Sequence, residues 1–272
     1  MGLQLSEGVR EVLNSRLRQL GYSLRWLPPR VLSRPDQSVE VDFSLLAAHL
    51  MLTTARPYFI GIGANDGVTH DPLYPFVRDF GWRGIMVEPI PEAFAALKRN
   101  YAEFNDIALV QAAIGPGDGR GTIYTVEISD QRSIMMSLHS SFRRDVLLRG
   151  KQWHPDLENR VIEREVLIMS FATLLARANG QVVDVLKLDT EGHDLEILKT
   201  VDLARLSPRL ILAEHANLSK NEKVKMADIL LDHGYRVSMT SLDMLGYKDI
   251  RAEAAMQNTC ANSCSDTRRG VE

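Results

Sequence analysis

Two apolar stretches in the second half of the chain each end in side chains that can carry charge or move a proton. They are Asp189, Glu191 and His193 after the first stretch, and Glu214 and His215 after the second. A carboxylate stabilises a nearby cation, and a neutral histidine or a carboxylate can take the proton of a hydroxyl nucleophile as it reacts. Because the carboxyl ends of parallel strands meet at one edge of a sheet, we expect these groups to share a ligand-binding edge.

The first half of the chain carries the pattern of a nucleoside-cofactor site. An apolar stretch breaks into a turn that contains Gly61, Gly63, Ala64, Asn65 and Gly67. Glycine has no Cβ and tolerates positive φ, so such a turn lets the backbone approach a ligand closely. The next apolar stretch ends in Glu88, whose carboxylate can accept hydrogen bonds from the two hydroxyls of a ribose. A third stretch ends in small residues, Ala112 and Ala113, which leave space for a flat ring.

Composition and charge narrow the class of protein. The 272 residues are 45% hydrophobic, which allows one large domain, alone or with an appendage. The net charge of -3 and the pI of about 6.2 give no overall attraction to nucleic acid or anionic lipid. No apolar stretch approaches the roughly 20 residues that a membrane span needs. Cys260 and Cys264 lie in a polar tail without partners for a disulfide or a metal, so we predict a cytoplasmic protein.

The sequence predicts three segments. Residues 1–56 are expected to form a helical appendage, in which 6–20 is an amphipathic basic helix that packs on the domain or contacts a membrane or partner. Asp42 is expected to cap a second helix, in which Phe43, Leu46 and Leu50 share one face. Residues 57–251 are expected to form the main domain. Residues 252–272 have few large apolar side chains and are predicted to be disordered.

From residue 58 onward, strand-like and helix-like stretches alternate, which is typical of an α/β fold. We predict a mostly parallel sheet with helices on both faces and an antiparallel strand late in the chain. The predicted strands are 58–62, 85–87, 107–114, 121–126, 161–169, 182–188, 210–213, 235–240 and 245–250. About thirty residues between 126 and 161 lack clear periodicity and include His139 and Trp153; such a long irregular stretch predicts a cover over the substrate.

Three blocks of the chain resemble the FkbM-type methyltransferases, which are class I S-adenosylmethionine-dependent enzymes with a Rossmann-like fold. The blocks are Ile62-Gly63-Ala64-Asn65-Asp66-Gly67, Val87-Glu88-Pro89-Ile90-Pro91 and Leu186-Lys187-Leu188-Asp189-Thr190-Glu191-Gly192. The resemblance covers residues 57–250, and the third block is the most specific. It implies S-adenosyl-L-methionine as the cofactor and transfer of a methyl group to a hydroxyl of a sugar, a glycan or a natural product.

The resemblance also implies roles for single residues. The backbone from Gly61 to Gly67 would face the methionine part of the cofactor, Glu88 would hold the ribose, Pro89 and Ile90 would border the adenine, and Asp189 would lie beside the methyl group. Many family members carry an acidic residue where this chain has Gly61, and that residue helps to hold the cofactor's amino group. Asp66 and Asp71 are the candidates to replace it. The candidate catalytic residues are His193, His215, His139 and Glu191.

Several alternatives stay open on the sequence alone. A nicotinamide-dependent oxidoreductase would also use a glycine-rich turn and an acid at the second strand, but the turn lacks the Gly-x-Gly-x-x-Gly spacing. A non-catalytic nucleoside-binding module would keep the fold without the reaction. Nucleic-acid methylation would need a basic stripe, which the acidic balance disfavours. A magnesium ion held by Asp189, Glu191, Glu214 and His215 has the right oxygen chemistry, but the spacing is too generic to assign metal ligands.

Overall fold

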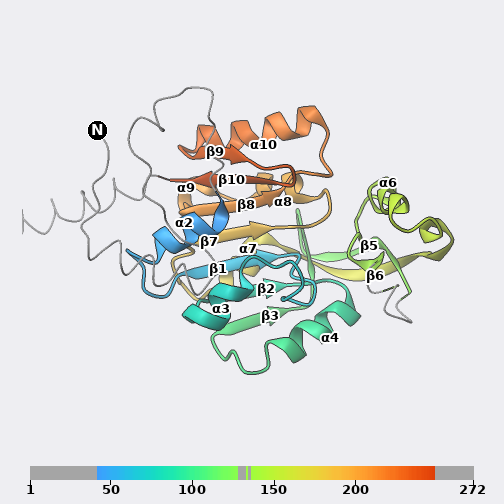
Figure 1. The fold of residues 1–272 in the computed structure, drawn as a ribbon, viewed down its shortest axis with the longest axis horizontal. Coiled ribbons are helices and arrows are strands. Elements are labelled where there is room, and N and C mark those ends of the chain that lie inside the picture. The colour runs from blue at the N-terminus through green and yellow to red at the C-terminus, as the bar shows by residue number, and fades with distance from the viewer. Residues whose placement is uncertain (1–41, 128–132, 134–135, 249–272) are drawn as a thin grey trace, which may run out of the picture.

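A computed structural model describes residues 42–127, 133 and 136–248, and within them a seven-stranded sheet forms the centre of the molecule (Figure 1). Its strand order is β3-β2-β1-β7-β8-β10-β9. The strands are β1 (Tyr58–Ile62), β2 (Arg83–Val87), β3 (Ile107–Val110), β7 (Val185–Leu188), β8 (Leu210–Glu214), β9 (Arg236–Met239) and β10 (Asp243–Tyr247). Every pairing is parallel except those of β10 with β8 and β9. The predicted mostly parallel sheet with a late antiparallel strand is therefore confirmed.

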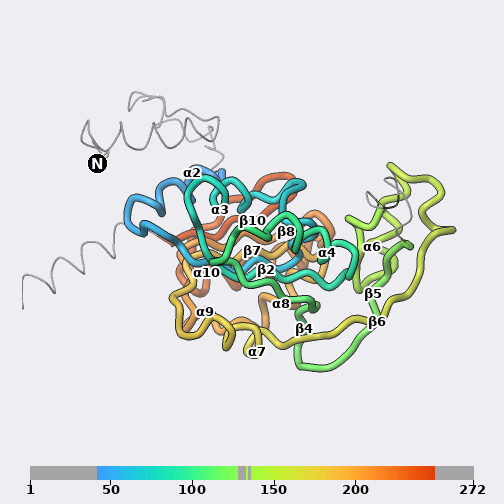
Figure 2. Tube along the Cα trace, turned by 90° about the horizontal axis from the view of Figure 1, so that it is seen from below, coloured from blue at the N-terminus to red at the C-terminus, as the bar shows by residue number. Residues whose placement is uncertain are grey.

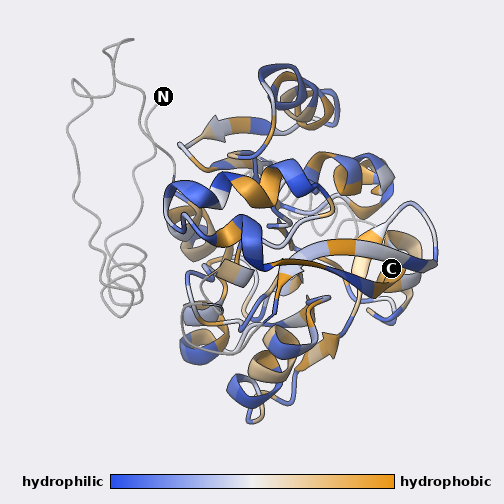
Figure 3. Ribbon diagram, turned by 90° about the vertical axis from the view of Figure 1, so that its right-hand side faces the viewer, coloured by the Kyte–Doolittle hydropathy of each residue, from blue (hydrophilic) through white to orange (hydrophobic). Residues whose placement is uncertain are grey.

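Helices cover both faces of this sheet, as Figure 2 shows for α2 and α3 on one side and α7 and α9 on the other. The helices are α2 (Phe43–Leu50), α3 (Tyr74–Phe80), α4 (Pro91–Asn100), α7 (Phe171–Ala176), α8 (Asp194–Thr200), α9 (Leu203–Leu206) and α10 (Lys220–Asp232). One apolar cluster joins α2, α3 and α4 to the sheet, and another joins the later helices to the opposite face. Hydrophilic and apolar residues alternate along the outer helices (Figure 3), because only one side of each helix packs on the sheet.

The register of the central strands aligns the segments that were expected to bind a ligand. Ile62 at the end of β1 pairs with Val87 of β2 on one side and with Leu188 of β7 on the other. Because all three strands run in the same direction, the glycine-rich turn, Glu88 and Asp189 leave the sheet at the same edge. All residues of β1 and β7 are buried, and buried central strands of this kind read as continuous apolar stretches.

A second sheet of three strands, in the order β4-β6-β5, stands beside the main one. Its strands are β4 (Ala113–Gly115), β5 (Gly119–Val126) and β6 (Val161–Ser170). The prediction of one strand over 107–114 is wrong in this respect: β3 ends at Val110, and β4 pairs with β6 instead of continuing in the main sheet. Ala112 and Ala113 lie at this crossing between the two sheets, where both are buried.

The irregular stretch before β6 folds into short helices that project to one side of the molecule (Figure 1). They are α6 (Arg144–Leu147) and two 3₁₀ turns, η1 (Leu148–Gln152) and η2 (Leu157–Arg160). A small core of their own, which includes Leu147 and Leu157, joins them to Val126 of β5. We call residues 136–160 the cover.

The predicted second helix is confirmed as α2, and Asp42 caps it by accepting a hydrogen bond from Ser44 N. The ring of Phe43 packs edge-on against the ring of Phe76 in α3, so α2 shares the core of the main domain. The predicted helix over 6–20, both cysteines and the tail 252–272 lie outside the described residues. Among the residues that the structure describes, no helix has the length and apolar character needed to cross a membrane. The cytoplasmic location stays a prediction.

Candidate active site

A cavity of about 690 Å³ opens at the carboxyl edge of the main sheet. This volume lies in the range of sites for small molecules and cofactors. Eight of the ten predicted cofactor-binding residues line it: Gly63, Ala64, Asn65, Glu88, Pro89, Ile90, Ala113 and Asp189. Gly61 and Gly67 do not line it.

The glycine-rich turn packs too closely for side chains at two positions. Gly63 has a φ of +79°, and a Cβ there would lie 1.7 Å from the Asp189 carbonyl oxygen. Gly67 has a φ of +75°, and a Cβ there would lie 2.4 Å from the Tyr101 ring. Asn65 also has a positive φ, 48°, which asparagine tolerates better than most residues. Gly67 therefore shapes the turn from behind, while Gly63 and Asn65 face the cavity.

Glu88 holds the turn as well as lining the cavity. One carboxylate oxygen accepts from Asn65 N at 2.8 Å, and the other accepts from Ile90 N at 2.8 Å. Burial raises the pKa of Glu88 to about 7, although these two backbone donors lower it. Each carboxylate oxygen has a second lone pair, so Glu88 can still accept from the hydroxyls of a ribose.

Lys187 forms a buried ionic cluster under the cavity. Its Nζ lies 3.1 Å from Asp189 Oδ2, 3.6 Å from Asp71 Oδ2 and 3.2 Å from the Gly63 carbonyl oxygen. Burial alone would lower the pKa of Lys187, but Asp189 and Asp71 together hold it above its usual value. One ammonium group therefore ties together the turn after β1, the segment before α3 and the end of β7.

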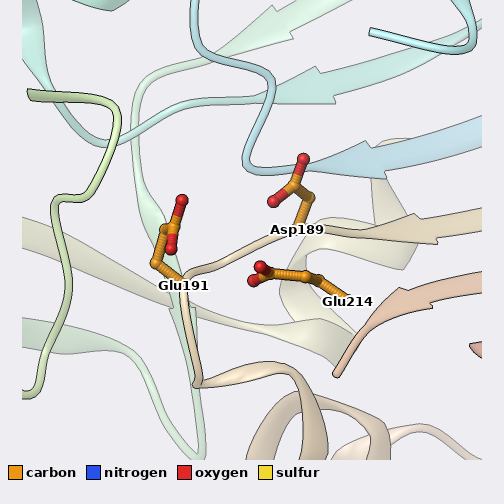
Figure 4. A group of neighbouring side chains, drawn as sticks. All are labelled: Asp189, Glu191 and Glu214. Atoms are coloured by element: carbon orange, nitrogen blue, oxygen red, sulfur yellow. The ribbon is translucent and has the colours of Figure 1, made fainter. Parts of the chain in front are cut away.

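Three carboxylates from the ends of β7 and β8 lie close to one another (Figure 4). Asp189, Glu191 and Glu214 each place an oxygen within 4.8 Å of the others. Asn217 Nδ2 donates to Glu191 at 2.7 Å and more weakly to Glu214 at 3.4 Å. Burial first, and then the neighbouring carboxylates, raises the pKa of Glu191 and of Glu214 well above the usual range. Such a cluster favours a cation or shared protons between its members.

Glu191 stands out within this cluster because its φ is +51°. A left-handed conformation is strained for a residue with a Cβ, and such strain gathers at functional sites. The cover holds this segment in place, since Ser141 Oγ donates to the Glu191 carbonyl oxygen at 2.7 Å. Glu191 and Asp189 both line the cavity, whereas Glu214 does not.

The structure separates the three candidate histidines. His193 and His139 line the cavity, and burial lowers the pKa of both, which favours the neutral form at pH 7. His215 does not line the cavity: its Nε2 lies 3.1 Å from the Thr240 carbonyl oxygen, which ties β8 to the segment before β10. Neighbouring residues of an extended chain point in opposite directions, so Glu214 faces the acid cluster and His215 faces away. This placement argues against both His215 as a base and His215 as a metal ligand.

The cover closes one side of the cavity with aromatic rings. Trp153 stacks on His139 with ring centroids 5.4 Å apart and planes 11° apart, yet 62% of Trp153 is exposed. Phe142 lies against His193 at 4.8 Å between centroids. Arg149 donates to the Asn217 carbonyl oxygen at 3.0 Å, so the cover is tied to the segment that carries the acid cluster.

Sequence reasoning missed two residues of the site. Lys187 belongs to the third block of the family resemblance, and a lysine inside an otherwise apolar strand is itself a signal, because lysine is rarely buried without partners. Asn217 gave no signal, since an asparagine after a strand usually belongs to a turn.

The raised pKa values predict how stability depends on pH. Burial raises the pKa values of Glu88 and Asp194 to about 7, so the folded state binds these protons more tightly than the unfolded state. Stability from such groups is complete below the unfolded pKa and is lost as pH rises through the folded pKa, so the free protein should melt lower at about pH 8 than at about pH 5.5. Glu214→Gln should reduce this slope, because it removes one such group, and Glu165→Gln on the surface should not. Calorimetric melting curves check this; a slope unchanged by Glu214→Gln would contradict it.

The sheet order, the single antiparallel strand and a cavity at the carboxyl edge define a Rossmann-like α/β protein of the class I methyltransferase type. Residues 61–237 match the family model of the methyltransferase FkbM domain, so the chain belongs to this family of S-adenosylmethionine-dependent methyltransferases. This membership sets the oxidoreductase alternative aside. No curated protein sequence matched the chain.

A comparison with solved structures found several methyltransferases. Methyltransferase FkbM from Methylobacillus flagellatus KT is 14% identical with a TM-score of 0.46, covering 71% of this chain and 44% of that one. Precorrin-6y C5,15-methyltransferase from Geobacter metallireducens GS-15 is 12% identical with a TM-score of 0.37, covering 74% and 86%. The N-terminal domain of human METTL16 is 15% identical with a TM-score of 0.39, covering 91% and 83%. The chain thus spans less than half the length of the Methylobacillus protein.

Proposed function

We propose that this protein is an O-methyltransferase that transfers the methyl group of S-adenosyl-L-methionine to a hydroxyl of a sugar, a glycan or a natural product. The observation that carries the proposal is Glu191, which lines the cavity beside Asp189. Its backbone has a strained, positive φ, and its carboxyl group has a raised pKa. A base whose pKa lies near the working pH is suited to proton removal from a weak nucleophile.

The residues present fit the cofactor. Glu88, Pro89 and Ile90 line one part of the cavity, where a carboxylate with spare lone pairs and an apolar surface suit a ribose and an adenine. Gly63 and Asp189 line the part next to them, where a carboxylate that is 41% exposed suits a sulfonium cation. When bound, S-adenosyl-L-methionine supplies an electrophilic methyl group.

In the proposed reaction, Glu191 accepts the acceptor's proton. With S-adenosyl-L-methionine bound, its methyl group would pass to the acceptor oxygen, S-adenosylhomocysteine would leave, and the Glu191 carboxylate would take up the hydroxyl proton. Asn217 orients that carboxylate through its hydrogen bond. Holding the oxygen in line with the methyl group supplies much of the rate, because orientation lowers the barrier to a two-substrate reaction.

The cover supports a ring-shaped acceptor with hydroxyl groups. Trp153 presents a large exposed ring surface at the cavity, and exposed tryptophans of this kind are frequent at binding sites. Thr190 also lines the cavity. A sugar offers both an apolar ring face for Trp153 and hydroxyl groups for Thr190.

A screen for methyl transfer tests the proposal. Candidate glycosides, glycans and hydroxylated natural products are incubated with the protein and with cofactor labelled on the methyl group, and products are analysed by mass spectrometry. We expect one labelled methyl group on a hydroxyl oxygen; label only on a carboxylate or a nitrogen contradicts the hydroxyl assignment. Parallel reactions with a chelator and with added magnesium test whether the three carboxylates use a metal. Cofactor binding without transfer to any compound would favour the non-catalytic module.

A further inference from the structure

We propose that Asp71 binds the ammonium group of the methionine part of the cofactor, an inference that rests on the cofactor assignment above. Asp71 lines the cavity, and its side chain is only 2% exposed. Its Oδ1 accepts from Leu73 N at 2.7 Å, but its Oδ2 has no hydrogen-bond partner among the described residues. A buried carboxylate oxygen without a partner is costly, so a ligand that supplies a donor there gains affinity.

Lys187 does not saturate this oxygen. Its ammonium has three donors, and three acceptors surround it: Asp189 Oδ2 at 3.1 Å, the Gly63 carbonyl at 3.2 Å and Asp71 Oδ2 at 3.6 Å. The third distance is beyond a hydrogen bond, so Asp71 receives attraction from Lys187 without a bond that satisfies it. Burial outweighs that attraction and raises the pKa of Asp71.

The position of Asp71 fits the amino-acid end of the cofactor. Glu88 and Ile90 mark the nucleoside end of the cavity, and they adjoin Asn65 in the turn. Asp71 and Lys187 adjoin Gly63 and Asp189, on the side of the sheet where β1 lies next to β7. A ligand with its ribose at Glu88 therefore extends its other end past Gly63 toward Asp71.

The neighbouring candidates cannot take this role. Gly61 has no side chain, and it does not line the cavity. Both carboxylate oxygens of Asp66 accept hydrogen bonds within its own turn. Oδ1 accepts from Val68 N and Thr69 N, and Oδ2 accepts from Thr69 Oγ1. Asp66 is also absent from the cavity lining. Asp71 is thus the candidate that both lines the cavity and keeps a carboxylate oxygen without a hydrogen-bond partner among the described residues.

The charges of the cluster agree with this assignment. When Asp71 and Asp189 are both ionised, Lys187 supplies the ammonium between them, which leaves one negative charge in excess; beside burial, this repulsion from Asp189 raises the pKa of Asp71. In a site of low dielectric constant, a second ammonium on the far side of Asp71 restores neutrality and gains strong Coulomb attraction. A ligand that lacks the amino group leaves that charge uncompensated.

Calorimetric titrations with two matched ligands test the inference without any turnover. The ligands are S-adenosylhomocysteine and its deamino analogue, which keeps the carboxylate and loses only the amino group. We expect Asp71→Asn to weaken binding of S-adenosylhomocysteine roughly 10- to 100-fold, as for a lost charge-assisted hydrogen bond, and to leave binding of the analogue nearly unchanged. Such a difference between ligands isolates the contact itself.

The other outcomes are each decisive. An equal loss for both ligands makes Asp71 a structural residue and overturns the inference, as does no loss for either. Asp66→Asn is the matched control and is expected to show no difference between the ligands. If the wild-type protein binds neither ligand, the cofactor assignment itself fails. If Asp71→Asn does not fold, a wild-type structure with S-adenosylhomocysteine decides: the ammonium nitrogen lies about 2.7–3.2 Å from Asp71 Oδ2, or the inference is wrong.

Discussion

Replacing Glu191 with glutamine is expected to lower turnover roughly 10²- to 10⁴-fold, the usual contribution of a general base, while affinity for S-adenosylhomocysteine stays nearly intact. Glutamine keeps the shape and can still accept from Asn217, so the local structure should survive. The wild-type rate is expected to increase as pH rises through the raised pKa of Glu191, because only the carboxylate accepts a proton. The variant should lose this dependence. Turnover with the acceptor from the screen and calorimetry with S-adenosylhomocysteine measure both parts.

Two further variants make this result specific. Glu196→Gln changes an exposed glutamate paired with Lys199, and it is expected to leave the rate unchanged. His193→Gln tests the neighbouring candidate base. Burial lowers the pKa of His193, so with His193 as the base the wild-type rate would no longer rise with pH above about 7. If His193→Gln lowers turnover roughly 10²- to 10⁴-fold and Glu191→Gln has only a mild effect, the base is His193 and the role of Glu191 is contradicted.

Lys187→Met is expected to lower the free energy of unfolding by about 3–5 kcal/mol, the usual result of removing one partner of a buried ion pair. Methionine fills similar space, but it leaves the buried Asp71 without a cation and the Gly63 carbonyl without a donor. Asp189 is partly exposed and regains solvent, so most of the cost falls on Asp71. Cofactor affinity is expected to fall as well, since the same ammonium positions the turn. Urea denaturation followed by circular dichroism gives the stability.

The matched control is Lys199→Met. Lys199 pairs with Glu196 on the surface, with 43% of its side chain exposed. Exposed ion pairs contribute about 0–1 kcal/mol, so this variant should lie close to the wild type. Equal stability changes in the two variants would show that the cluster around Lys187 does not hold the site together.

The sequence predicted the central strands of the main sheet, because nearly every residue of these strands is buried. β1, β7 and β8 are apolar stretches, interrupted in β7 only by Lys187, and polar residues stand at or just after their ends, so both the strands and their common edge were predictable. The second sheet was not, because β4 and β5 pair with residues of β6 that lie 35 to 55 positions later in the sequence, and local pattern does not specify such partners. The apolar stretch over 107–114 therefore looked like one strand.

The sequence predicted which residues of the candidate site stand at the ends of strands, but it did not predict the directions in which their side chains point. Glu214 and His215 follow the same strand, yet only Glu214 joins Asp189 and Glu191. The choice between Asp66 and Asp71 also depended on hydrogen bonds, since the Asp66 carboxylate accepts hydrogen bonds from backbone groups of its own turn. The stacking of Trp153 on His139 depends on how the cover folds, which its irregular sequence did not indicate.

Calorimetric titration of S-adenosylhomocysteine into the wild type, Glu88→Gln and Glu88→Ala tests most directly that this cavity is the cofactor site. We predict one site per chain in the wild type, and a loss of about 1.5–3 kcal/mol in binding free energy for Glu88→Ala, because hydrogen bonds to a charged group disappear. Glu88→Gln retains an acceptor and should lie between the two. Unchanged affinity in Glu88→Ala, or a wild type that binds NAD and not S-adenosylhomocysteine, would contradict the account.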